Sequence, residues 1–232
     1  MLHFRLLLLT GTLLAASPVL AETRTYDLAA FHAIDIQTGI NATVVRGDDQ
    51  SVTAETGSSD TLTDLKVEVV DGTLKAYVDR SFFDFRLFDL RQIHMTITVP
   101  ALDTVSASSG ADVQVDGLAG QNVRVDVSSG ADLDVINVAA ETIDIGVSSG
   151  ADASLTGTCG TARVSVSSGS NLNAATLECR AVDADASSGA DADVFASAEL
   201  RADASSGGDI TVHGNPAKRD TDESSGGDVD IR

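Results

Sequence analysis

Apolar and polar residues alternate along most of this chain, and a Ser-Ser-Gly tripeptide interrupts the alternation at regular intervals. The tripeptide occurs seven times, 18 to 20 residues apart, and its copies begin at Ser108, Ser128, Ser148, Ser167, Ser187, Ser205 and Ser224. In each copy the Gly is followed by Ala, Gly or Ser and then by Asp, except that Asn171 takes the Asp position once. A fixed period of this kind is typical of repeat architectures.

Each repeat carries two segments in which every second residue is apolar. Val123, Val125 and Val127 precede one tripeptide, and Leu133 and Val135 follow it. Period two indicates strands with one buried face. Because one repeat cannot bury that face alone, we expect stacked coils in which each strand pairs in parallel with its counterpart one repeat later, about 4.8 Å away. The pattern predicts an all-β fold, a right-handed parallel β-helix (solenoid) with coils of about 20 residues.

The Ser-Ser-Gly turns have a structural interpretation. We expect each Gly to adopt a backbone conformation with φ > 0, which Gly reaches without steric cost. Stacked Ser hydroxyls can donate hydrogen bonds along the column or to the turn backbone. We favour this role over that of a Ser nucleophile.

The two cysteines test the register of the coils. Cys159 and Cys179 each lie eight residues before a Ser-Ser-Gly tripeptide, so they share one phase in consecutive coils. Stacking would place their Cα atoms about 5 Å apart, within the range of a disulfide. In an exported chain we expect this bond to form.

The N-terminal third follows the same logic less regularly. Ile34 and Ile36 alternate before a Thr38-Gly39 turn, so the helix is expected to begin there. Further strands are expected at Val52–Ala54, Leu65–Val70, Leu74–Val78 and Ile93–Val99, with a hairpin turn at Asp71-Gly72. We therefore expect residues 22–232 to form a single β-helix domain, with irregular coils and a cap over 22–100 and regular coils over 101–232.

The two ends of the solenoid differ in character. Most of the aromatic residues gather in one segment, which contains Phe82, Phe83, Phe85 and Phe88. This segment is either an exposed apolar ligand patch or a lid that packs over the open end of the core, and we favour the lid. At the other end Arg219, Thr221 and Glu223 replace the inward apolar residues, and such polarity discourages end-to-end aggregation.

The first 21 residues have the features of a secretory signal peptide. Arg5 precedes an apolar stretch from Leu6 to Ala16, and small residues lead to an expected cleavage site after Ala21. A membrane anchor is the alternative, but the apolar stretch is well short of the roughly 20 residues that span a bilayer. We expect an exported protein with no membrane insertion after cleavage.

The composition is strongly acidic and poor in aromatic residues. The chain has 35 Asp and Glu against 15 Lys and Arg, a formal net charge of −20, which argues against nucleic acid and anionic membrane surfaces as partners. Aromatic residues make up 4% and Trp is absent, so the core must consist of small aliphatic side chains. The basic residues look scattered, which leaves cations and cationic surfaces as the partners that charge permits.

The Asp after each turn forms the sharpest candidate site. The weak calcium candidates are Asp112, Asp132, Asp152, Asp191, Asp209 and Asp228. Stacked carboxylates about 5 Å apart repel, so either solvent screens them or cations bridge them. Calcium favours such oxygen ligands, but the nine-residue Gly-rich repeat of calcium-binding β-rolls is absent. We favour a solvated turn and expect no cofactor, with calcium left open.

No constellation of residues specifies catalysis. Paired carboxylates occur anywhere in so acidic a chain, so they carry little weight as glycosidase residues. His32, His94 and His213 share no motif, and no Gly-rich phosphate loop opens a helix. We expect a protein that is not an enzyme; a carbohydrate-active β-helix enzyme is the alternative.

The ordered motifs of the chain resemble a known family. They are Phe31-His32-Ala33-Ile34-Asp35-Ile36, Thr38-Gly39-Ile40-Asn41, Gly47-Asp48-Asp49-Gln50-Ser51-Val52, Val70-Asp71-Gly72-Thr73-Leu74, Val99-Pro100-Ala101-Leu102 and the Ser-Gly-Ala-Asp turns. Together they are similar to the putative autotransporter adhesin head GIN domain family, a domain of unknown function, over essentially the whole mature chain. The resemblance implies a β-helical cell-envelope protein and supplies no catalytic residues.

The expected function is a non-catalytic secreted or envelope module, an adhesin-like or scaffold binding protein. Its expected partner is an envelope or extracellular protein or glycan. A calcium-stabilised structural repeat protein is a second alternative. The chain ends at Arg232 without an amphipathic β-barrel translocator. We therefore expect the periplasm, or release to the extracellular surface, of a Gram-negative bacterium.

Overall fold

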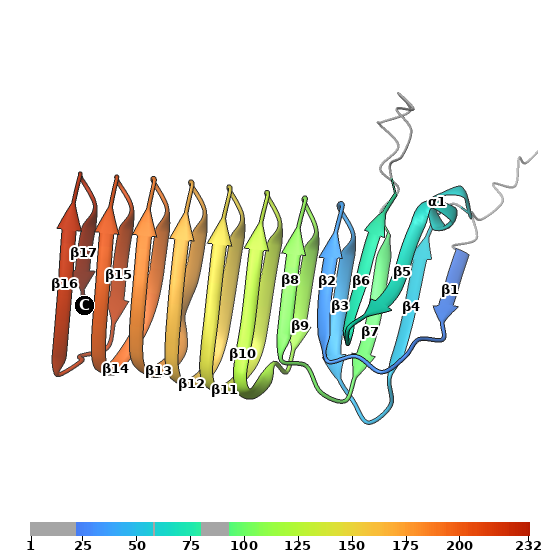
Figure 1. Ribbon diagram of the computed structural model, residues 1–232, viewed down its shortest axis with the longest axis horizontal. Helices are drawn as coiled ribbons and strands as arrows, with labels where there is room; N and C mark the ends of the chain where they lie inside the picture. Colours follow the sequence, from blue (N-terminus) through green and yellow to red (C-terminus); the bar gives the residue numbers. More distant parts are fainter. Residues whose placement is uncertain (1–21, 58, 80–92) are drawn as a thin grey trace, which may run out of the picture.

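The computed structural model describes residues 22–57, 59–79 and 93–232, which form stacked β-coils along one axis (Figure 1). The elements of this part of the chain are β1 (Glu22–Tyr26), β2 (Ala33–Gln37), β3 (Asn41–Arg46), β4 (Ser51–Thr56), α1 (Ser59–Asp64), β5 (Leu65–Val70), β6 (Thr73–Val78), β7 (His94–Val99), β8 (Thr104–Ser108), β9 (Asp112–Asp116), β10 (Ala119–Ser128), β11 (Asp132–Ser148), β12 (Asp152–Ser167), β13 (Asn171–Ser187), β14 (Asp191–Ser205), β15 (Asp209–His213), β16 (Lys218–Ser224) and β17 (Asp228–Ile231). The proposed signal peptide and Phe82, Phe83, Phe85 and Phe88 lie outside the described residues. Within the described ranges, no helix is long and apolar enough to cross a membrane.

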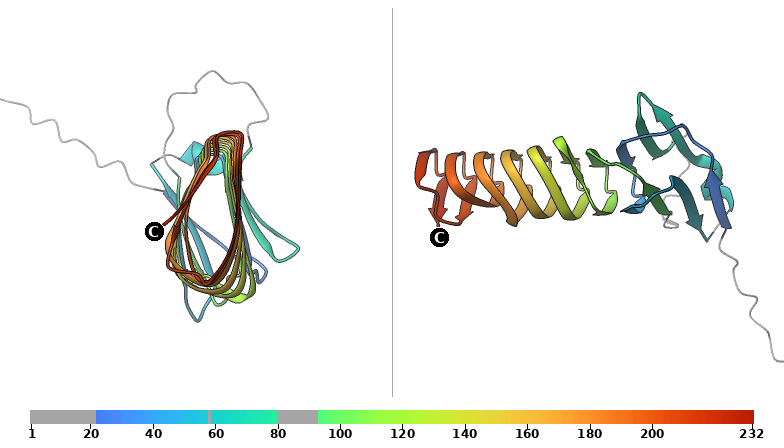
Figure 2. Two further views of the ribbon diagram at one scale, coloured as in Figure 1. Left: turned by 90° about the vertical axis from the view of Figure 1, so that its left-hand side faces the viewer. Right: turned by 90° about the horizontal axis from the view of Figure 1, so that it is seen from below.

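Each coil is a flattened loop with two sheets, seen end-on in Figure 2. Strands rise to the Ser-Ser-Gly turns on one side and descend on the other, and the coils advance as a right-handed solenoid (Figure 1). The outward side of β8, β10, the C-terminal halves of β11–β14, and β16 is named the pre-turn face. The outward side of β9, the N-terminal halves of β11–β14, β15 and β17 is named the post-turn face. The predicted all-β parallel solenoid is confirmed.

The core consists of in-register columns of small aliphatic side chains. Val125 pairs with Val105 on one side and Ile145 on the other, and all three are buried. Burial follows from the period-two pattern, because every second residue points between the two sheets. In the last coil, Arg219, Thr221 and Glu223 take the places of Leu200, Ala202 and Ala204 and are exposed. The column of apolar residues therefore ends in a polar coil, as the sequence predicted.

The turns join the two sheets through two consecutive residues with positive φ. In one repeat Ser129 has φ 57° and Gly130 has φ 66°, and the other Ser-Ser-Gly turns repeat this geometry. The pair of positive values is that of a type I′ turn. The Gly130 N–H donates to the carbonyl of Ser149 in the next coil at 3.2 Å. The positive φ at Gly was predicted, whereas the positive φ at the second Ser was not.

The N-terminal coils are out of sequence order. β2 and β3 form a coil around the Thr38-Gly39 turn and pair in parallel with β8 and β9. Their other edges pair in parallel with β6 and β7, so a further coil lies outside the one at which the helix was expected to begin (Figure 1). This insertion leaves neither edge of the β2–β3 coil open, and Ile34 and Ile36 are fully buried.

Antiparallel strands cover the N-terminal end of the stack. β5 pairs with β6 through the Asp71-Gly72 hairpin, β4 pairs with β7, and β1 pairs with β4. β5 and β4 use the outer edges that the β6–β7 coil would otherwise leave unpaired, and β1 pairs with the far edge of β4. The hairpin at Asp71-Gly72 was predicted from the sequence.

The disulfide fixes one corner of the solenoid. Cys159 and Cys179 pair in register on β12 and β13, with their Cα atoms 4.5 Å apart, and form a disulfide. The predicted bond is confirmed. It links two consecutive coils across a chain separation of 20 residues.

Candidate functional site

The Asp residues that follow the turns form one column on the post-turn face. Backbone register places them side by side from strand to strand, in the order Asp112, Asp132, Asp152, Asn171, Asp191, Asp209 and Asp228. All seven side chains are exposed. The column arises because each of these residues is the first outward residue after a turn, and strand pairing repeats that position every 4.8 Å or so.

A second polar column runs beside the first, two residues further along each strand. Its members are Gln114, Asp134, Ser154, Asn173, Asp193, Thr211 and Asp230. Sequence reasoning missed this column, although its residues share one phase of the repeat. Between the two columns lies a shallow groove of about 710 Å³ that runs from Asp112 and Gln114 to Asp209 and Thr211. This groove is named the acidic groove.

Burial and repulsion between neighbouring carboxylates act together in the acidic groove. Burial, together with the neighbouring charges of Asp152 and Asp112, raises the pKa of Asp132. Asn171 interrupts the column and donates a hydrogen bond from its Nδ2 to Oδ1 of Asp152 at 2.6 Å. No basic residue is among the residues that line the groove. The groove therefore presents carboxylate oxygens as hydrogen-bond acceptors, and no basic residue of the lining offsets their negative charge.

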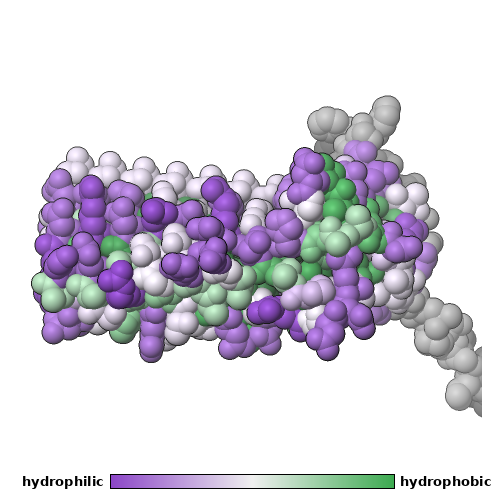
Figure 3. All heavy atoms as spheres, turned by 60° about the horizontal axis from the view of Figure 1, so that its bottom comes forward, coloured by the Kyte–Doolittle hydropathy of each residue, from purple (hydrophilic) through white to green (hydrophobic). Residues whose placement is uncertain are grey.

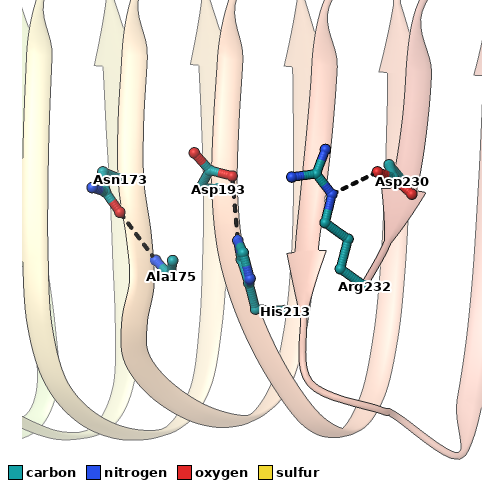
Figure 4. Close-up of polar contacts among 6 residues, drawn as sticks. All are labelled: Asn173, Ala175, Asp193, His213, Asp230 and Arg232. Atoms are coloured by element: carbon teal, nitrogen blue, oxygen red, sulfur yellow. Dashed lines mark hydrogen bonds and ion pairs between the residues drawn. The ribbon is translucent and has the colours of Figure 1, made fainter.

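Cationic partners on this face lie at its C-terminal end. Figure 4 shows Nε2 of His213 directed at Oδ1 of Asp193, 3.4 Å away, and Nε of Arg232 directed at Oδ2 of Asp230, 2.7 Å away. Both acids belong to the second column. The first column has no ion pair of this kind among the described residues, so its charge is free to meet an external group.

The pre-turn face differs because the charges of one of its columns alternate in sign. One column of in-register residues runs Arg124, Asp144, Arg163, Asp183, Arg201 and Asp220. Arg163 lies 3.2 Å from Asp144, and Arg201 lies 3.7 Å from Asp183. This column is named the alternating column. The interpretation of the basic residues as scattered was wrong, because three of the arginines share one phase of the repeat.

The surface in Figure 3 is hydrophilic over most of the regular coils, and apolar side chains gather near the N-terminal coils. The three histidines in the described part of the chain do not form a shared site. His32 pairs with Asp103 at 3.1 Å, His94 lies beside Asn41 in the sheet, and His213 pairs with Asp193. Among the described residues, no three His, Cys, Asp or Glu side chains converge to hold a metal ion.

Three comparisons with known proteins bear on the fold. The family model described as "Putative auto-transporter adhesin, head GIN domain" matches residues 30–216. A search of curated proteins found no match. A solved structure described as a putative adhesin from Bacteroides fragilis is similar with TM-score 0.80 and 22% identity, covering 91% of this chain and 97% of that one.

Two further solved structures come from Parabacteroides. One from Parabacteroides distasonis, described as a putative lipid binding protein, has TM-score 0.65 and 15% identity, covering 91% of this chain and 96% of that chain. One from Parabacteroides merdae, described as a putative adhesin, has TM-score 0.65 and 14% identity, with the same two coverages. At these identities the likeness shows the fold alone.

Proposed function

This chain belongs to the putative auto-transporter adhesin, head GIN domain family, whose model spans residues 30–216, and we propose that it is an exported, non-catalytic binding module. It binds a positively charged partner through the acidic groove. The partner is an envelope or extracellular protein or glycan that carries amino or guanidinium groups. Export by way of the signal peptide at residues 1–21 is part of the proposal.

The asymmetry between the two faces is the observation that carries this proposal. On the pre-turn face, the guanidinium groups of Arg124, Arg163 and Arg201 each form an ion pair with a neighbouring carboxylate. On the post-turn face the acidic groove has no basic lining residue. Uncompensated like charge disfavours the folded state. A binding role explains why the charge is retained, because a cationic partner relieves the repulsion between the carboxylates.

The chemistry of the groove fits an extended cationic partner. Carboxylates repeat along the stack at the strand spacing of about 4.8 Å. Ser154, Asn173 and Thr211 in the second column add neutral hydrogen-bonding groups. Charged contacts of this kind steer association and set specificity more than they raise affinity. We therefore expect fast, salt-sensitive binding.

A binding role accounts for the carboxylates better than glycoside hydrolysis does. A retaining glycosidase uses one pair of carboxyl groups about 5 Å apart, with one pKa raised. Here the spacing recurs along the whole face rather than at one pair, and the groove lining has no aromatic side chain to hold a sugar. Hydrolysis of a polysaccharide by the purified protein would overturn the non-catalytic part of the proposal.

The experiment compares two triple variants of equal charge. One carries Asp132→Asn, Asp152→Asn and Asp191→Asn in the acidic groove. The matched control carries Asp126→Asn, Asp185→Asn and Asp203→Asn on the pre-turn face. Poly-L-lysine serves as the cationic probe, and titration calorimetry at low salt measures its dissociation constant.

We expect the groove variant to bind poly-L-lysine about tenfold more weakly than the wild type, since three surface charge contacts at about 0.5 kcal/mol each amount to that factor. We expect the control variant to bind within about twofold of the wild type. Equal losses in both variants would mean that net charge alone governs binding, which would refute a role for the groove.

A further inference from the structure

The alternating column on the pre-turn face has a property that a random set of surface ion pairs lacks. Its six members, Arg124, Asp144, Arg163, Asp183, Arg201 and Asp220, change sign at every coil. An even number of alternating charges is complementary to its own reverse. We propose that this face is the interface of a two-fold symmetric dimer, with a second copy of this chain as its partner.

The symmetry follows from the geometry of two sheets that face each other. A two-fold axis that runs along the strand direction, between the copies, reverses the order of coils and leaves each column opposite itself. Arg124 then faces Asp220 of the second copy, Asp144 faces its Arg201, and Arg163 faces its Asp183. Every member of the alternating column therefore meets the opposite charge.

The neighbouring column also fits its own reverse. Around Gly146 and Ser165 the pre-turn face has a hollow of about 270 Å³. The same axis places Asp203 of the second copy opposite Gly146, and its Asp185 opposite Ser165. The carboxylates of the second copy thus meet the smallest side chains of this column. Asp126 opposite Asp222 is the like-charge contact that remains in it.

The charged groups are available for these contacts. The side chains of Arg163 and Arg201 are 63% and 59% exposed, and those of Asp144 and Asp183 are 48% and 50% exposed. Their ion pairs within the chain hold them in the plane of the face, which reduces the side-chain entropy lost on association.

The size of the face sets the expected strength of the dimer. Six coils at about 4.8 Å, with strand segments about 20 Å long, cover roughly 1,000 Å² counted over both partners. That area is at the low end for specific interfaces, so we expect a weak, salt-sensitive dimer. It uses the face opposite the acidic groove, so it does not depend on the proposed function.

The test uses two single charge reversals and their mixture. Arg163→Asp places two pairs of like charges in a homodimer, because the two-fold axis repeats each contact. Asp183→Arg does the same for the same reason. A heterodimer of one copy of each variant has opposite charges at both contacts. Asp134→Arg, on the post-turn face, is the control, since it makes the same change in net charge as Asp183→Arg. Sedimentation velocity at 20 mM and 500 mM salt measures association, and circular dichroism confirms that each variant folds.

We expect wild type and the Asp134→Arg control to dimerise at low salt and to dissociate at high salt. Each reversal at the interface should raise the dissociation constant about tenfold. An equimolar mixture of the two reversals should regain dimers of wild-type strength. A wild type that stays monomeric at low salt, or a mixture no more associated than its components, would overturn the proposal. Binding of poly-L-lysine at the acidic groove would be unaffected by either result.

Discussion

Removal of one charge from the Asp column should stabilise the fold, and the size of the gain follows from the column itself. Asp132 has a charged neighbour on each side, Asp112 and Asp152. At the strand spacing of about 4.8 Å, each neighbour repels it by about 0.9 kcal/mol in water, and screening at 0.15 M salt roughly halves this. Asp132→Asn should therefore raise the free energy of unfolding by about 1 kcal/mol at 0.15 M salt and by about 0.3 kcal/mol at 1 M.

Asp191 supplies a matched control for this calculation. Its neighbours are Asn171 and Asp209, so it has one charged neighbour rather than two. Asp191→Asn should yield about half the gain of Asp132→Asn. Of the three variants, Asp152→Asn should raise the free energy of unfolding least, because it also loses the charge-assisted hydrogen bond from Asn171.

The pH dependence of the same variant has a definite sign. Because the pKa of Asp132 is raised in the fold, its protonated form is favoured there relative to the unfolded chain. Its contribution to stability is therefore present at low pH and is lost as the pH rises through the raised pKa. The stability gained by Asp132→Asn should be full at pH 7 and should shrink as the pH falls through the raised pKa of Asp132. Urea unfolding of the variant and the wild type, at 0.15 M and 1 M salt and from pH 7 downward, measures this difference in the free energy of unfolding. An Asp132→Asn variant no more stable than wild type at pH 7 and 0.15 M salt would show that repulsion within the column does not destabilise the fold.

Three further predictions concern the turns, the disulfide and calcium. Gly130→Ala should lower the free energy of unfolding by about 1 kcal/mol, because a Cβ there meets nothing within 4 Å and only the positive φ opposes it. Gly157→Ala should lower it by about 3 kcal/mol, because its Cβ meets the backbone of Val138. Equal losses in urea unfolding would contradict this. Replacement of Cys159 and Cys179 by Ser should cost about 3 kcal/mol for a closed loop of 20 residues, and a double variant as stable as wild type would count against the estimate. Calcium should shift the melting temperature no more than sodium at matched ionic strength, since the carboxylates form a column rather than a cage; a calcium-specific rise of many degrees would contradict this.

The regular coils could be predicted because one rule, repeated, determines them. The Ser-Ser-Gly period fixes the register, so the pairing of Val125 with Ile145 and of Cys159 with Cys179 follows from counting residues. A slip of one residue would turn every apolar side chain outward, which leaves one register compatible with the sequence.

The order of the N-terminal coils could not be predicted in the same way. Strands β2, β3, β6 and β7 all alternate and all suit a coil, and period alone does not say which of them lies outermost. Their arrangement depends on contacts between segments far apart in the chain, such as Ile34 with Leu74 and with Val105. The repeats are imperfect there, so counting residues gives no register.

Only one of the polar columns on the two faces was predicted from the sequence. The Asp column stands out because its members all follow the tripeptide at the same distance. The second column mixes Asp134 and Asp193 with Ser154 and Asn173, so no single residue type marks it. The alternating column was missed for a related reason, because a repeat search looks for the same residue at each position and here the charge changes at every coil. Both columns are evident once positions are compared by phase.

Backbone amide chemical shifts recorded while poly-L-lysine is titrated into the protein would show directly whether the acidic groove is the binding face. We expect shift changes confined to β9, β15 and the N-terminal halves of β11–β14, and largest near Asp132 and Asp152. Changes of similar size on the pre-turn face, or changes confined to the ends of the solenoid, would contradict this expectation.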